Sequence, residues 1–291
     1  MISSLAISAL PTRSELVAVL ASTLLIGLAA SPAATADEGS FNDRGNILIA
    51  DQYNNRVIEI DRDTHKIVWQ FGSGSDKPGS NSVVGTNDAE RVGTFTLISG
   101  TGIPSSPVAA PLPGCSDPAN GCPDNRVFIV NRGGHIVWRY GQDGGVSGSG
   151  FNQLNTPVHA LFLSEFPNHP GFHVMITDQA NERVIVVNAK HQIVWQYGTT
   201  GVADIGPNLL NNPNSAELLE NGHVLIADEN NNRVIEVTRD KEIVFQQGRL
   251  NVLGSGFDLL NGPYDAKAIG DYTGLTPPFD WDTSEMPTSL R

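Results

Sequence analysis

Four short segments of the sequence share an alanine, and the residue directly before that alanine differs from one segment to the next. The segments read NDAERV from Asn87, PVHALFL from Pro157, PNSAELL from Pro213 and PYDAKAI from Pro263. The variable residues are Asp88, His159, Ser215 and Asp265. Such groups can hydrogen-bond a polar ligand, and a histidine beside a carboxylate can act as a base or nucleophile. We take them as the candidate ligand site; the alternative is that they only hydrate a water-filled channel.

The element that must position these residues is a repeat. Residues 45–72, GNILIADQYNNRVIEIDRDTHKIVWQFG, return as residues 173–198, HVMITDQANERVIVVNAKHQIVWQYG, and again as residues 222–248, GHVLIADENNNRVIEVTRDKEIVFQQG. A fourth copy is split by an insertion into TLISGTG from Thr96 and DNRVFIVNRGGHIVWRYG in residues 124–141. Repeats of this length indicate an array of supersecondary units.

Each copy has the composition of short β-strands. LIAD, RVIEI and KIVWQF are rich in isoleucine, valine and aromatic residues, and asparagine, aspartate and glycine separate them. Runs such as RVIVV and VLIA are apolar at successive positions, so both faces of their sheets should be buried. A parallel sheet would need crossover helices, and no amphipathic helical pattern lies between the strands. The sequence therefore predicts an all-β fold, a β-propeller whose blades pack face to face.

The segments with the shared alanine would be the inner strands of the blades. There are four of them, and the closing strands also number four, beginning at Ile67, Ile136, Ile193 and Ile243. We therefore expect four blades. The first copy lacks an inner strand, whereas the last inner strand, residues 263–269, lacks followers. We predict that this C-terminal strand pairs with residues 47–51 and closes the ring, which would remove open sheet edges. An incomplete or oligomerising arc is the alternative.

This interpretation divides the chain into residues 1–36 as a signal peptide, 37–271 as the propeller and 272–291 as an irregular C-terminal tail. An insertion over residues 103–123 is rich in proline, so we expect it to lack regular strands and to project from the surface. Its Cys115 and Cys122 are the two cysteines of the chain. We predict that they form a small structural disulfide.

The N-terminus and the charge indicate an exported protein. The apolar run LVAVLASTLLIGLAA begins at Leu16, and Ala34 and Ala36 give the small-x-small pattern of a cleavage site before Asp37. The run is shorter than the roughly 20 residues that span a bilayer. We predict a secreted or periplasmic protein without stable membrane insertion after cleavage; an uncleaved anchor is the alternative. The net charge of −13 argues against nucleic acid as a partner.

Two repeated residue types have scaffold interpretations. A carboxylate ends the same strand in three copies, at Asp51, Asp178 and Asp228. Such a group could bind calcium, but its recurrence favours hydrogen bonds to turn amides and to the arginine that begins the next strand. The closing strands repeat an aromatic residue, at Trp69, Trp138, Trp195 and Phe245. We expect these rings to pack between blades.

One histidine pair has a spacing that suits zinc. His169 and His173 are four residues apart, which suits zinc only on a helix, and the Pro170-Gly171 pair between them excludes a helix. We predict no metal site.

The pattern LIADxxNNRVIE resembles the NHL repeat, over nearly all of residues 45–269. The passage IDRDTHKIVWQFG is similar to quinoprotein-type repeats, which also occur in arylsulfotransferase-type propellers. The resemblance implies a β-propeller, and NHL proteins widely serve as binding platforms. Some exported relatives are zinc-dependent amidating lyases with three channel histidines, and arylsulfotransferases use a channel histidine as nucleophile. This chain departs from the lyases, because only His159 falls on an inner strand.

We therefore expect an exported propeller that acts as a binding module for a small molecule or a protein. The alternative is a propeller enzyme, a hydrolase, lyase or sulfotransferase-like protein, that uses His159 as base or nucleophile with Asp88 or Asp265 orienting it. An enzyme needs His159 within hydrogen-bond reach of a carboxylate, whereas a binding module does not. The sequence identifies no cofactor, partner or catalytic residue.

Overall fold

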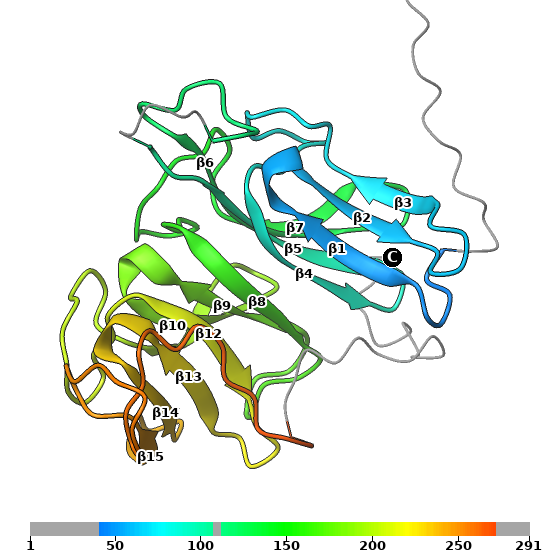
Figure 1. Ribbon diagram of the computed structural model, residues 1–291. Helices are drawn as coiled ribbons and strands as arrows, with labels where there is room; N and C mark the ends of the chain where they lie inside the picture. Colours follow the sequence, from blue (N-terminus) through cyan, green and yellow to red (C-terminus); the bar gives the residue numbers. More distant parts are fainter. Residues whose placement is uncertain (1–40, 107–111, 272–291) are drawn as a thin grey trace, which may run out of the picture. The chain divides into compact units, whose positions relative to one another are not determined.

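The described residues form four antiparallel sheets, one for each predicted blade (Figure 1). The structure is a computed structural model that describes residues 41–106 and 112–271, so the predicted signal peptide and C-terminal tail lie outside the described residues. The predicted all-β propeller of four blades is confirmed. In the described segments, no helix is both long and apolar enough to span a membrane.

The first blade has three strands and each of the others has four, in consecutive order. The first two blades comprise β1 (Ile47–Asp51), β2 (Arg56–Ile60), β3 (Ile67–Phe71), β4 (Thr86–Val92), β5 (Phe95–Ile103), β6 (Cys122–Val130) and β7 (Ile136–Tyr140). The last two comprise β8 (Pro157–Leu163), β9 (His173–Asp178), β10 (Arg183–Asn188), β11 (Ile193–Tyr197), β12 (Pro213–Leu218), β13 (Val224–Asp228), β14 (Arg233–Val237) and β15 (Ile243–Gln247). Single 3-10 turns connect strands in three blades: η1 (Gln52–Asn54), η2 (Gln179–Asn181) and η3 (Glu229–Asn231).

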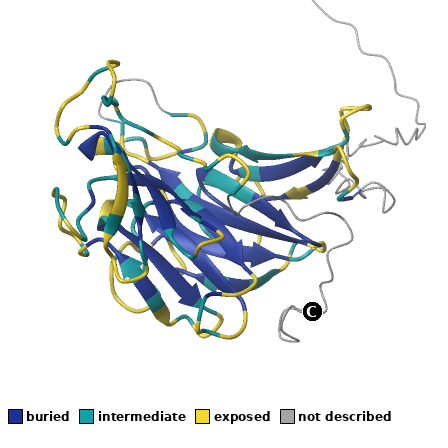
Figure 2. Cartoon of the chain, turned by 90° about the horizontal axis from the view of Figure 1, so that it is seen from below, coloured by how far each residue is buried: buried dark blue, intermediate teal, exposed yellow. Residues whose placement is uncertain are grey.

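The hydrophobic core lies between adjacent blades. Separate clusters of buried side chains join the first blade to the second, the second to the third, and the third to the fourth. Strand β9 shows how the sequence produces this arrangement: Val174 and Ile176 contribute to the cluster with the second blade, and Met175 to the cluster with the fourth. Successive side chains of a strand point to opposite faces, so a continuous apolar run buries both. Figure 2 shows these buried strands running through the interior, with exposure concentrated in the loops.

The repeated tryptophans lie between blades, as predicted. Each indole nitrogen donates a hydrogen bond to a backbone oxygen in a turn of the following blade, at 3.0 Å for Trp69 to Arg132, 3.3 Å for Trp138 to Ala189 and 2.9 Å for Trp195 to Arg239. Phe245 is half-exposed in the fourth blade, so the prediction of inter-blade packing is wrong there. Each tryptophan packs against a following blade, whereas no cluster of described residues covers Phe245 from a following blade.

The predicted closure of the ring is not formed. Strand β1 pairs with β2 alone among the described residues, and residues 263–269 form no strand. The C-terminal segment is instead held beside β12, where the Lys267 ammonium pairs with the Glu217 carboxylate and Ala266 N donates to Ser215 Oγ at 3.3 Å.

The insertion is more regular than the sequence predicts. Strands β5 and β6 extend into it, so that Ile103 faces Cys122 and Gly102 faces Pro123. Pro123 is tolerated because it lies at the start of β6, where the ladder with β5 shifts its register. The predicted Cys115–Cys122 disulfide is confirmed, with Cα atoms 5.6 Å apart.

Gly114 joins the insertion to the first blade, so the insertion packs against the molecule as well as extending from the second blade. The Asn55 amide donates a 2.7 Å hydrogen bond to the Gly114 carbonyl. Gly114 has a φ of +78°, and a Cβ added there would lie 2.2 Å from the Tyr53 carbonyl oxygen. The close approach therefore requires glycine at this position.

Candidate functional site

An ion pair fixes the turn at one end of each blade, and it is buried in every blade except the first. The carboxylates of Asp51, Asp178 and Asp228 accept a hydrogen bond from Nε of Arg56, Arg183 and Arg233, each at 2.7 Å. The predicted scaffold role of these carboxylates is therefore confirmed. In the third and fourth blades the same carboxylates also accept the N–H of Asn155 at 2.7 Å and of Asn211 at 2.8 Å, which fixes the linker that enters the blade.

In the second blade the aspartate of this ion pair comes from the same strand as the arginine rather than from the preceding strand. Its Arg126 bonds Asp124, two residues earlier on β6, and Asp124 Oδ2 accepts the N–H of Val84 in the entering linker at 2.6 Å. The usual aspartate position is occupied by Gly100, where an added Cβ would lie 2.6 Å from the Asp124 carboxyl carbon. The interrupted copy thus keeps the aspartate–arginine pair that anchors the turn and the entering linker, although its repeat is broken.

These turns surround a cavity of about 500 Å³ that all four blades line. The first residue of each 3-10 turn lines it, at Gln52, Gln179 and Glu229, with Thr101 in the second blade. The residue two positions before the shared alanine of each inner segment lines it as well, at Asn87, Val158, Asn214 and Tyr264. The lining contains no lysine, arginine or histidine, and Glu229 is its one carboxylate among the described residues. The cavity is therefore polar and close to neutral.

Side-chain amides pair across neighbouring blades around the cavity. Gln52 Nε2 donates to Asn87 Oδ1 at 2.6 Å, and Gln179 Nε2 donates to Asn214 Oδ1 at 2.5 Å. Asn214 in turn donates to the Glu229 carboxylate. Each glutamine is thereby oriented, while its carbonyl oxygen has no bond among the described residues. An oriented amide can accept and donate hydrogen bonds at the same surface.

The four variable inner residues lie next to the cavity but do not line it. Asp88 Oδ2 accepts the N–H of Ala160 on the next inner strand at 3.0 Å, and Ser215 makes the corresponding bond to Ala266. Asp265 Oδ1 accepts from the Lys267 ammonium at 3.2 Å. His159 Nε2 lies 4.0 Å from Glu217 Oε1. The cavity-lining position of each inner segment is the residue directly before the predicted one, and the predicted ligand role of the four residues stays a prediction.

The inner strands also carry charged groups that the sequence analysis missed. The buried Glu90 carboxylate accepts the N–H of Phe162 at 2.9 Å. Burial raises the pKa of Glu90 to about 8, and the nearby Asp88 and Glu217 carboxylates add to the increase. Burial of the Lys267 ammonium acts against its charge, but Glu217 and Asp265 outweigh that effect and raise the pKa of Lys267. A signal for both groups was present, since Glu90, Glu217 and Lys267 each follow the shared alanine directly.

Lys267 also lowers the pKa of the Asp265 carboxyl. Burial alone would raise the pKa of the Asp265 carboxyl, but Lys267, the Ser215 hydroxyl and His159 together hold it below its ordinary value. At neutral pH the C-terminal inner segment therefore carries the Asp265 carboxylate next to the Lys267 ammonium group. Within the described residues, no group of three or more histidine, cysteine, aspartate or glutamate side chains could hold a metal ion.

No protein-family model matches the chain, and no curated protein matches it either. Among solved structures, virginiamycin B lyase from Staphylococcus aureus is similar at 15% identity, with a TM-score of 0.41, over 72% of this chain and 54% of the lyase. The chain thus spans about half the length of that relative. A streptogramin B lyase structure is similar at 12% identity with a TM-score of 0.38, over 72% of this chain and 66% of that one. We draw no functional argument from these similarities.

Proposed function

We propose that the protein is an NHL-like propeller that binds a small, uncharged polar molecule in the cavity between its four blades. The observation that supports this most directly is the cavity lining, which brings oriented amides and hydroxyl groups from every blade to one place. Concave sites with a few convergent polar groups are the usual location of small-molecule binding.

The lining favours an uncharged ligand. No basic side chain lines the cavity in the described part of the chain, so an anionic ligand would find no counter-charge there. The Glu229 carboxylate already accepts hydrogen bonds from Asn212 and Asn214. Amides and hydroxyls complement hydroxyl or amide groups on a ligand, and the exposed rings of Tyr53 and Tyr264 offer surfaces for stacking. We therefore propose neutral sugars and uncharged peptide groups as the ligand classes.

We propose a supporting role for the four variable inner residues. Asp88, His159, Ser215 and Asp265 each follow directly after a cavity-lining residue of the same segment. A ligand that extends along the inner segments would contact them, and their different chemistry would distinguish the groups it presents to each blade.

The geometry supports binding more than catalysis. An enzyme that uses His159 needs this imidazole within hydrogen-bond reach of a carboxylate. The separation of 4.0 Å from Glu217 exceeds that reach, and Glu217 is engaged by Lys267. We also propose export, which the disulfide supports because disulfides persist in oxidising compartments.

Calorimetry with neutral oligosaccharides and uncharged peptides, each matched with a charged analogue, tests the proposal. We expect uncharged probes to bind and charged analogues to bind more weakly. Gln179→Leu should weaken binding by about 1–3 kcal/mol, since the ligand group would lose its partner. The exposed Gln192→Leu variant is the control and should bind as the wild type does. Equal affinities for the wild type and Gln179→Leu would reject the site.

A further inference from the structure

In the part of the chain that the structure describes, the first blade lacks one strand at its inner edge. It contains β1, β2 and β3, and β1 pairs with β2 alone among the described residues, whereas the corresponding strand of every other blade pairs on both sides. Ile47 of β1 is consequently 43% exposed, although its counterparts Val174 and Val224 are completely buried. An unpaired, partly apolar strand edge is a template for another strand.

The C-terminal segment has the sequence and the anchoring of the missing strand. Gly262 N donates to the Asn232 side chain at 3.0 Å, as Thr156 N donates to Asn125 at 2.8 Å where the third blade begins. The bond from Ala266 N to Ser215 matches the bond that holds Ala160 on β8. The segment thus lies against the fourth blade as the inner strand of a following blade would.

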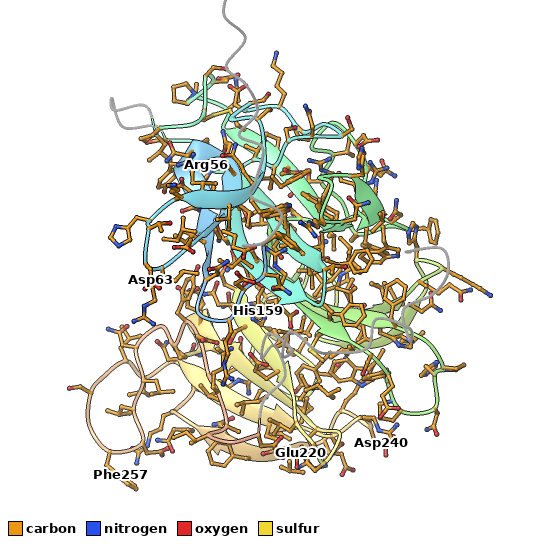
Figure 3. The ribbon with its side chains drawn as sticks, turned by 90° about the vertical axis from the view of Figure 1, so that its right-hand side faces the viewer. Arg56, Asp63, His159, Glu220, Asp240 and Phe257 are labelled. Atoms are coloured by element: carbon orange, nitrogen blue, oxygen red, sulfur yellow. A yellow bond between two sulfur atoms is a disulfide. The ribbon has the colours of Figure 1, made fainter. Side chains whose placement is uncertain are left out.

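Among the described residues, no following blade receives the segment. Ile269 is fully exposed, although its counterparts Val92 and Leu163 on the other inner strands are buried. Figure 3 shows Phe257, in the linker before this segment, projecting outward from the sheets. In the described part of the chain, no hydrophobic cluster joins the fourth blade to the first.

Among the described residues, the Asp51 carboxylate of the first blade also lacks a backbone N–H from an entering linker. Asp178 and Asp228 each accept a backbone N–H from the linker that enters their blade, at Asn155 and Asn211. The shared LN pattern makes Asn261 the corresponding donor for the first blade. The Asp51 and Arg56 side chains remain 25% and 31% exposed, and the described bonds of the Asp51 carboxylate go only to Arg56 and Asn54.

We propose that a second copy of this chain completes the first blade, with residues 254–269 of one molecule occupying β1 and the Asp51–Arg56 anchor of the other. The two surfaces are complementary because they derive from one repeat, and the donated segment would take up strand pairing on binding. The other blades pair Ala89 with Ile98, Ala160 with Ile176 and Ala216 with Ile226. In that register, Ala266 of one copy faces Ile49 of the other, and Ala268 faces Ile47.

The contact is head-to-tail, so it forms a ring if the rotation closes and a filament if it does not. Two copies of four blades bring eight, which is within the usual range for propellers. The proposal concerns assembly and does not depend on the ligand proposed for the cavity.

Two exposed side chains allow the contact to be broken without disturbing the isolated chain. Ile47→Lys alters the receiving strand and Ile269→Lys alters the donated segment, and each would bury an unpaired ammonium only in the assembly. By sedimentation equilibrium we expect the wild type to have at least twice the mass of one chain, and each variant to associate at least about a hundredfold more weakly. Val202→Lys, an exposed apolar residue of another linker, is the matched control and should associate as the wild type does.

Mixing the two variants gives the decisive result. Ile47→Lys keeps an intact donated segment and Ile269→Lys keeps an intact receiving strand, so an equimolar mixture should form a heterodimer through one undamaged contact. A wild type that stays monomeric at its highest soluble concentration would overturn the proposal in favour of closure within one chain. Variants that associate as the wild type does, or a mixture that stays monomeric, would overturn it as well.

Discussion

Glu90→Gln should change how the stability of the protein depends on pH. Glu90 is buried on β4, where its carboxylate accepts the N–H of Phe162, and its pKa is raised to about 8. Glutamine has nearly the same size and keeps an acceptor oxygen for the Phe162 N–H, but it cannot ionise. The substitution therefore removes the titration while leaving the packing in place.

The direction and size of the effect follow from the raised pKa. Between pH 4.5 and 8 the folded protein retains a proton that the unfolded chain releases, so the contribution of Glu90 to stability is fully present below pH 4.5 and is lost as the pH rises through 8. Each pH unit in this window corresponds to about 1.4 kcal/mol, so the full window corresponds to about 5 kcal/mol. The glutamine variant should therefore gain stability relative to the wild type as the pH rises.

Urea unfolding of both proteins at pH 5, 7 and 9 measures this difference. We expect the stability of the variant minus that of the wild type to rise by about 3–5 kcal/mol between pH 5 and 9. The exposed Glu242→Gln variant is the control and should follow the wild-type profile. A difference that stays constant over this range would show that Glu90 ionises normally in the folded protein, and the reasoning from its burial would be wrong.

Three further results should follow from the structure. Asp228→Ala should lower the free energy of unfolding by about 3–5 kcal/mol, because it leaves a buried arginine unpaired. Asp51→Ala should lower it by about 0–1 kcal/mol, because its ion pair is more exposed. Chemical unfolding measures both. The buried His173 ring has a pKa lowered by burial, so its contribution is present above pH 6.5 and is lost as the pH falls; melting temperatures of His173→Phe should therefore decline less than those of the wild type between pH 7.5 and 5. Reducing the disulfide should cost at most about 2–3 kcal/mol, measured by unfolding with and without reductant, and a loss of the whole fold would contradict this estimate.

The parts of the fold that repeat could be predicted from the sequence. Strand faces, the Asp178–Arg183 type of anchor and the indole contacts of Trp138 recur because each blade packs against its neighbours in the same way. The disulfide could also be predicted, since its two cysteines lie seven residues apart in one insertion.

The features that depend on particular contacts between distant residues could not be predicted. The buried Glu90 carboxyl accepts the N–H of Phe162, 72 residues later, and no local pattern reveals that contact. Ring closure failed as a prediction because the sequence shows that residues 263–269 match an inner strand but not which sheet edge receives them. The cavity-lining Gln52 and Gln179 were missed because each directly follows a repeated aspartate that the sequence assigns to the scaffold.

The ion pair of the second blade has a consequence for engineering. Because Asp124 and Arg126 both follow the insertion on one strand, the loop before them carries neither member of the anchor. Loops of other lengths and sequences could therefore be transplanted between β5 and β6 while the blade keeps its register. Part of that loop borders the cavity, at Ser105 and Asn120. The second blade is thus the place where a library of grafted loops that keep the Gly114 contact with Asn55 could alter the selectivity of the proposed ligand site.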